Sequence, residues 1–62
     1  MNSKEIEQKL SEEHPDYVFV VGDNAGGCFI SVVQGDWLWQ RNNMTTPESC
    51  YRAAKTVIAA RG

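Results

Sequence analysis

The 62-residue sequence has little cysteine, proline and histidine, and it has no long hydrophobic run. Its two cysteines are too few for the disulfide framework that staples many small secreted domains. No apolar stretch reaches the ~20 residues of a transmembrane helix, and the first residues lack the apolar centre of a signal peptide. We therefore expect a cytoplasmic protein with no membrane contact and with both thiols reduced.

The residues that could carry catalysis are scarce and do not form a known pattern. The only histidine, His14, precedes a proline where a helix is expected to end, so we expect a solvated boundary residue. Cys28 and Cys50 fall on predicted core faces, where a thiol is normally inert. Together with His14 they lack the paired spacing of a zinc site. The glycine-rich stretch 22–27 has no lysine and leads into a strand, unlike a phosphate-binding loop. We expect no enzyme activity, no cofactor, no metal and no small-molecule substrate.

The composition indicates one small folded domain covering residues 1–62. The chain is 42% hydrophobic and 23% charged, which is typical of a globular protein and not of a disordered one. A core of this size rarely contributes more than ~3–5 kcal/mol, so such domains often depend on staples or on a partner chain.

The hydrophobic pattern predicts two helices and three strands. Ser3 is the expected N-cap of the first helix, and Pro15 ends it. A capping threonine, a proline and an acid at Thr46, Pro47 and Glu48 are typical of the start of the second helix. The expected elements are a helix at residues 3–13, strands at 17–21, 28–34 and 37–41, and a helix from residue 47 onward. This order predicts an α+β fold, α-β-β-β-α, with a three-stranded antiparallel meander and both helices packed on one face.

The turn between the last two strands determines which way the tryptophans point. A two-residue turn at Gly35 and Asp36, with glycine first, favours a hairpin that pairs Gln34 with Trp37. Paired residues share a face, and side chains alternate along a strand, so Trp37 and Trp39 lie on one face. Because this face is the bulkier and more apolar one, we expect it to be the core.

The first hairpin extends the same face to the first strand. A four-residue loop at 23–26 would pair Val21 with Cys28 and Phe19 with Ile30. The predicted core face then consists of Tyr17, Phe19, Val21, Cys28, Ile30, Val32, Trp37 and Trp39.

The opposite face of the sheet keeps large apolar residues, and no predicted element is left to cover them. A patch of this kind usually marks a contact surface. We therefore predict a small non-enzymatic protein–protein interaction module that forms a homodimer or a heterologous complex. Small acidic chains of this type (pI about 5.1) include regulators and inhibitors carried by phages and mobile elements. The predicted binding residues on the sheet face are Val18, Val20, Phe29, Val33 and Leu38.

A second predicted binding surface lies on the first helix and the turn after it. Its acidic residues could engage a basic surface on a partner protein; the alternative is that they only keep the helix soluble. These residues are Glu5, Glu12, Glu13 and Asp16.

The element order, the central hairpin and the alanine-rich last helix resemble the double-stranded-RNA-binding domain. That resemblance implies that the last helix binds phosphates, yet this helix begins with Pro47 and Glu48 where the family has a lysine cluster. The first hairpin loop has no histidine, although the family uses one in the minor groove. The alternative function is therefore a degenerate nucleic-acid-binding domain with a weak basic face. Its predicted contact residues are Arg41, Arg52, Lys55 and Arg61.

Overall fold

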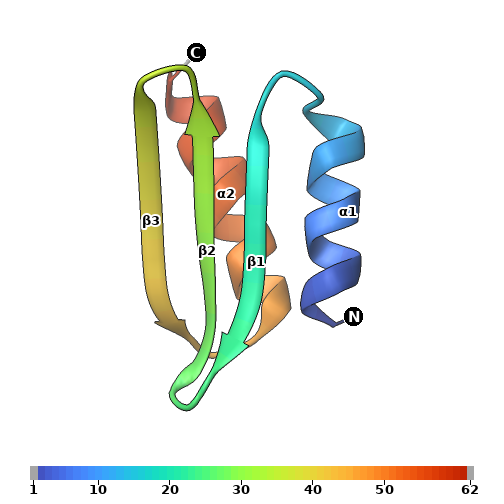
Figure 1. The fold of residues 1–62 in the computed structure, drawn as a ribbon, viewed down its shortest axis with the longest axis vertical. Helices are drawn as coiled ribbons and strands as arrows, with labels where there is room; N and C mark the ends of the chain where they lie inside the picture. The colour runs from blue at the N-terminus through green and yellow to red at the C-terminus, as the bar shows by residue number, and fades with distance from the viewer. Residues whose placement is uncertain (1, 62) are drawn as a thin grey trace.

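A computed structural model describes residues 2–61 of the chain. The elements are α1 (Ser3–Glu13), β1 (Val18–Asn24), β2 (Gly27–Gln34), β3 (Trp37–Met44) and α2 (Pro47–Arg61). The strands form one antiparallel sheet in the order β1-β2-β3. Helix α2 lies behind the sheet and α1 lies beside β1, so one face of the sheet carries no helix (Figure 1). The predicted α+β class and α-β-β-β-α order are confirmed.

The first helix is capped by Asn2, so the prediction that Ser3 is the cap is wrong. The Asn2 side chain accepts the backbone N–H of Glu5 at 2.9 Å, and the Glu5 carboxylate accepts the backbone N–H of Asn2 at 3.0 Å. This reciprocal capping box satisfies two N–H groups at the helix start. Ser3 is instead the first helical residue, and its buried hydroxyl donates to the Asp23 carboxylate at 2.8 Å, which ties α1 to β1.

The first hairpin differs from the predicted one by two residues. Its turn consists of Ala25 and Gly26 alone, and Val21 pairs with Ile30, not with Cys28. Strand β1 therefore begins one residue later and ends three residues later than expected. The shift is an even number of residues, so every side chain stays on its predicted face.

The second hairpin has the predicted register, but β3 is longer than expected. The pairs are Gln34–Trp37, Val33–Leu38, Val32–Trp39 and Ile30–Arg41. Beyond Arg41 the strand continues to Met44, which pairs with Cys28. Between this pair and the Ile30–Arg41 pair, β3 has one residue more than β2, so β3 forms a bulge. Asn43 lies in the bulge with a positive φ of 58°, a conformation that asparagine tolerates better than most residues.

The core lies between the sheet and the two helices. Trp37 and Trp39 face it as predicted, but both remain half-exposed and are not full core residues. They lie on an edge strand, and arginine side chains cover their outer surfaces. The Arg61 guanidinium lies 4.0 Å from the ring centre of Trp37, and that of Arg41 lies 5.2 Å from Trp39. The buried hydrophobic residues are Ile6, Leu10, Phe19, Val21, Cys28, Ile30, Val32, Cys50 and Ala54.

Candidate protein interface

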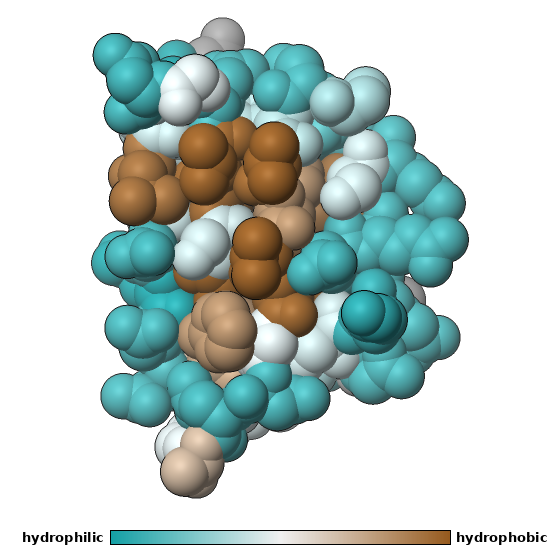
Figure 2. Space-filling model, viewed as in Figure 1, coloured by the Kyte–Doolittle hydropathy of each residue, from teal (hydrophilic) through white to brown (hydrophobic). Residues whose placement is uncertain are grey.

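The face of the sheet opposite the helices brings together the five apolar residues that the sequence predicted there. We call Val18, Val20, Phe29, Val33 and Leu38 the sheet-face patch. Val18, Val20 and Leu38 are 62%, 47% and 56% exposed, and Phe29 and Val33 are half-buried. Figure 2 shows hydrophobic side chains gathered over the strands and surrounded by hydrophilic ones. The patch is therefore continuous, and water covers it in the isolated chain.

The register arranges this face in cross-strand rows. Val18 pairs with Val33, and Val33 pairs with Leu38, so one row across the sheet is entirely apolar. In the next row Ser31 accepts a hydrogen bond from the Gln40 side chain at 3.4 Å. Seven positions make up the central part of the face, and none of them is charged: Val18, Val20, Phe29, Ser31, Val33, Leu38 and Gln40.

Phe29 extends the patch over the first strand. Its partner in the register is Gly22, and a Cβ at that position would lie 2.7 Å from the Phe29 ring. The ring therefore occupies the space that a side chain on β1 would need. This contact partly buries Phe29.

The two edges of the sheet are less suited to binding than its open face. On the outer edge of β1, the Glu7 side chain of α1 accepts the backbone N–H of Val21 at 2.9 Å. This N–H group is therefore not free to pair with an added strand. The outer edge of β3 pairs with no strand within residues 2–61, but its last part carries the bulge and the exposed polar run 40–43. Bulges and polar side chains discourage the addition of another strand.

The four acidic residues predicted as a second surface are mostly engaged within the chain. Glu5 belongs to the capping box, and Glu12 accepts a long hydrogen bond of 3.4 Å from Gln8. Asp16 accepts the side-chain amide of Gln34 at 3.1 Å. Together with Glu13, described next, they are spread along α1 and the following turn and each has an internal partner.

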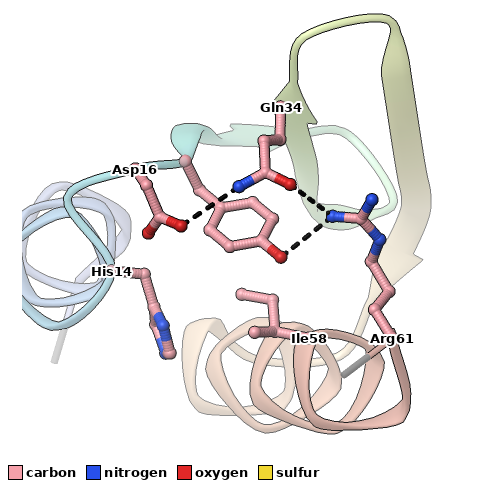
Figure 3. A pocket seen from close by; sticks show the side chains of 6 residues that line it. His14, Asp16, Gln34, Ile58 and Arg61 are labelled. Atoms are coloured by element: carbon pink, nitrogen blue, oxygen red, sulfur yellow. Dashed lines mark hydrogen bonds between the residues drawn. The ribbon is translucent and has the colours of Figure 1, made fainter.

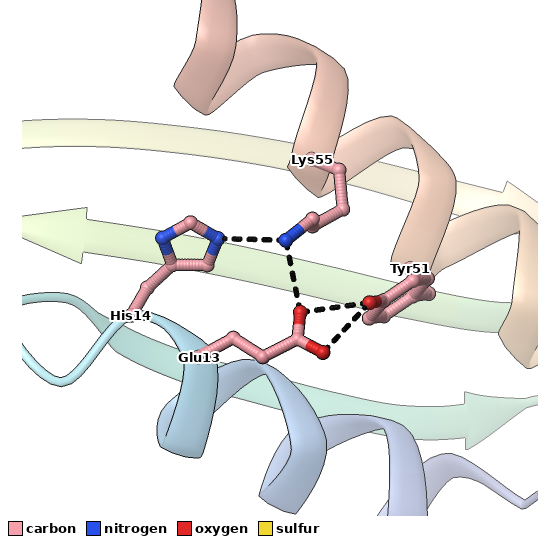
Figure 4. A network of polar contacts seen from close by, with 4 residues as sticks. All are labelled: Glu13, His14, Tyr51 and Lys55. Atoms are coloured by element: carbon pink, nitrogen blue, oxygen red, sulfur yellow. Dashed lines mark hydrogen bonds and ion pairs between the residues drawn. The ribbon is translucent and has the colours of Figure 1, made fainter.

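Glu13 joins α1 to α2 through a polar network (Figure 4). It accepts the Tyr51 hydroxyl at 2.7 Å and the Lys55 ammonium at 2.9 Å, and Lys55 Nζ lies 3.2 Å from His14 Nε2. The hydrogen bond from Lys55, followed by that from Tyr51, lowers the pKa of Glu13 below its ordinary value of 4.5. The same carboxylate raises the pKa of Lys55 and of Tyr51. The only histidine thus lies at the edge of an interhelical ion pair.

We expect Lys55→Gln to raise the pKa of Glu13 toward 4.5, because the largest cause of its lowering is removed. A carboxylate with a lowered folded-state pKa stabilises the fold above its unfolded-state pKa and loses that contribution as pH falls through the folded-state value. The stability difference between wild type and variant should therefore shrink below about pH 4.5. Carbon-detected NMR titration of the Glu13 carboxyl measures the shift. Arg52→Gln, on the same helix, is the control; an equal shift in both variants would contradict a specific pair.

The four basic residues of the nucleic-acid alternative do not form one free surface. Lys55 is paired with Glu13, and Arg41 lies over Trp39. Arg61 donates from Nη1 to the Tyr17 hydroxyl at 2.9 Å and to the side-chain oxygen Oε1 of Gln34 at 2.8 Å (Figure 3). Arg52 is exposed on α2. Lys55 and Arg61 are therefore occupied by contacts to other elements, and Arg41 by a contact to Trp39 on its own strand, a feature that the sequence pattern did not reveal.

Two shallow depressions lie on the helix side of the molecule, each of about 400 Å³. The walls of the first include Arg61 and the two residues that accept its hydrogen bonds, Tyr17 and Gln34 (Figure 3). The second lies between Trp39 and the small side chains of α2. The residues that line the first are His14, Asp16, Tyr17, Gln34, Ile58 and Arg61. Those that line the second are Trp39, Arg41, Ala53, Thr56, Val57 and Ala60.

The described residues contain no helix long and apolar enough to cross a membrane. They also contain no group of three or more His, Cys, Asp or Glu side chains placed to hold a metal ion. Comparisons of the chain with protein-family models, curated proteins and solved structures find no match.

Proposed function

We propose that this protein is a small non-enzymatic interaction module that binds another protein through the sheet-face patch, and that the partner is a second copy of the chain. The observation that carries the proposal is the uncovered apolar row formed by Val18, Val33 and Leu38. Monomeric proteins rarely leave large contiguous apolar surfaces in water, and such surfaces usually bind something.

The geometry favours this patch over the other two predicted surfaces. On α1, Glu5 and Glu13 are held by intramolecular hydrogen bonds, so a partner would have to compete with them. On α2, Lys55 is neutralised by Glu13, which weakens the attraction to a phosphate backbone. A partner that binds the sheet-face patch breaks no internal hydrogen bond or ion pair of these apolar side chains, because it displaces only water from them. A role as a phage or mobile-element regulator or inhibitor stays a prediction.

A second copy matches the patch in charge and in hydrogen bonding. The seven central positions are uncharged, so two patches can meet without burying an unpaired charge. The polar pair Ser31 and Gln40 already share a hydrogen bond, and Gln40 lies on the edge strand β3, where its remaining amide groups can keep contact with water. A two-fold interface places the same patch on both sides, as in most homodimers, and two sheets can pack face to face about 10 Å apart.

The size of the patch sets the strength of the proposed dimer. A stable interface buries about 800 Å² on each partner. Three strands of a few exposed residues each offer less than this, so we expect a weak and reversible dimer. Its dissociation constant should lie in the micromolar range, which corresponds to about 8 kcal/mol or less of binding free energy.

Sedimentation velocity from about 10 μM to about 1 mM tests this proposal across the expected dissociation constant. Wild type should show a rising sedimentation coefficient, and Leu38→Glu should weaken association at least tenfold, about 1.4 kcal/mol, by placing a charge in the interface. The matched control is Ser11→Glu, which adds the same charge at an exposed position on α1. Circular dichroism should show both variants folded.

Two results would overturn the proposal. A wild-type chain that stays monomeric at the highest concentration has no second copy as its partner. Equal weakening by Leu38→Glu and Ser11→Glu would mean that net charge controls association and that the sheet-face patch does not.

A further inference from the structure

The two cysteines meet inside the core, although they are 22 residues apart in the chain. Cys28 on β2 and Cys50 on α2 place their sulfur atoms 3.5 Å from each other. Both side chains are buried, with 2% and 0% exposure, and both are free thiols. The Cys28 thiol also lies 3.5 Å from the Met44 carbonyl on β3. Each sulfur therefore has the other as a close neighbour, at the point where α2 rests on the sheet.

We propose that Cys28 and Cys50 form a dithiol–disulfide couple, in which a low-molecular-weight disulfide such as oxidised glutathione converts the pair into an intramolecular bond between β2 and α2. A disulfide holds its sulfurs about 2.05 Å apart. The two sulfurs are already in van der Waals contact, so a small adjustment of both side chains closes the remaining gap. The connection joins two elements that pack together in the reduced fold, so the overall architecture is kept.

The reaction proceeds by two thiol–disulfide exchanges. One cysteine thiolate attacks a sulfur of oxidised glutathione, forms a mixed disulfide and releases one glutathione thiolate. The second cysteine thiolate then attacks the protein sulfur of that mixed disulfide and releases the second glutathione. Overall the two protein thiols lose two electrons and two protons, and oxidised glutathione gains them to become two glutathione thiols. No other reactant is required.

The burial of the pair controls the rate of this exchange. Burial, and then the neighbouring Cys28 thiol, raise the pKa of the Cys50 thiol to about 12. The thiolate is the reactive form, so very little of it is present near neutral pH while the fold stays closed. Oxidation is therefore expected through openings that lift α2 off the sheet, and it should accelerate when mild urea makes these openings more frequent.

The bond should stabilise the fold because it restricts the unfolded chain. It closes a segment that contains most of the β2–β3 hairpin and the start of α2. A loop of this length removes enough unfolded-state entropy to raise the melting temperature of such a small domain by roughly 10–25 °C. Because the disulfide stabilises the fold, the fold must stabilise the disulfide by the same free energy. The equilibrium constant for disulfide formation should therefore be about 100-fold larger in the native chain than in the unfolded chain.

The experiment equilibrates the full chain with glutathione buffers of varied oxidised-to-reduced ratio, once in native buffer and once in concentrated urea. After an acid quench, free thiols are alkylated in denaturant and intact masses are measured. We expect one monomeric species without alkylated thiols. The equilibrium constant for disulfide formation, taken from the glutathione composition at which half of the chain is oxidised, should be about 100-fold larger in native buffer than in urea. Cys28→Ser and Cys50→Ser should give only mixed disulfides with glutathione. If either serine variant fails to fold, the wild-type comparison between buffer and urea still decides.

Three results would overturn the inference. The first is the persistence of both free thiols at every ratio in native buffer, even when mild urea is added to make the openings more frequent. The second is the formation of mixed or intermolecular disulfides alone. The third is an equal midpoint in native buffer and in urea, which would mean that the fold does not hold the sulfurs together. The sheet-face patch lies on the other side of the sheet, so this test and the sedimentation test succeed or fail independently.

Discussion

Replacing Leu10 with alanine is expected to cost about 3 kcal/mol of unfolding free energy, which approaches the whole stability of a domain this small. Leu10 is 0% exposed and packs in the core from the last turns of α1. The loss has two parts: the burial free energy of the deleted side-chain atoms, and the cost of the cavity that they leave in a close-packed interior. Urea unfolding followed by tryptophan fluorescence measures it, and much of the variant population should be unfolded without denaturant.

The chain contains only one other leucine, and it provides a matched control. Leu38 is 56% exposed in the sheet-face patch, so Leu38→Ala removes the same atoms from a solvated position. In the monomer it should change stability by no more than about 0.5 kcal/mol. Both variants should be measured below the concentration at which wild type associates. An equal loss in the two variants would mean that the sheet face is part of a closed core.

The strand register was predictable where a turn residue determined it. Gly35 and Asp36 specify a two-residue hairpin, and the pairing of β2 with β3 near the turn follows from that alone. The first turn was harder to locate because residues 22–27 contain several glycines and offer several registers. The alternation of apolar residues still gave the correct faces, since all registers that differ by two residues share them. The predicted sheet-face patch depends only on that alternation.

The side-chain partners around the candidate site could not be predicted, because they depend on how the helices sit on the sheet. Glu13 meets Tyr51 and Lys55 across some forty residues of chain, and Arg61 meets Tyr17 across a similar distance. No local pattern encodes such contacts. The half-exposure of the tryptophans has the same origin: their face follows from the hairpin, but their burial depends on how far α2 reaches over the edge strand β3.

Replacing Gly27 with alanine should cost about 3 kcal/mol or more. Gly27 opens β2 with a φ of +134°, which L-residues rarely adopt, and a Cβ at this position would overlap the backbone carbonyl oxygen of Met44. A backbone oxygen cannot rotate away as a side chain can, so either the bulged end of β3 or the first turn must move. Urea unfolding measures the loss, and amide shifts should change at the bulge around Asn43 and Met44.

Gly35→Ala is the reference for that cost. Gly35 also has a positive φ, +61°, but a Cβ there meets no atom within 4 Å. Alanine at this turn should therefore show only the strain of the left-handed conformation, about 1 kcal/mol. The excess cost of Gly27→Ala over Gly35→Ala then reports the close approach of the first turn to β3 together with the more restrictive φ of Gly27. Equal costs would mean that the β3 bulge yields freely at Met44 and that the φ of Gly27 restricts alanine no more than that of Gly35.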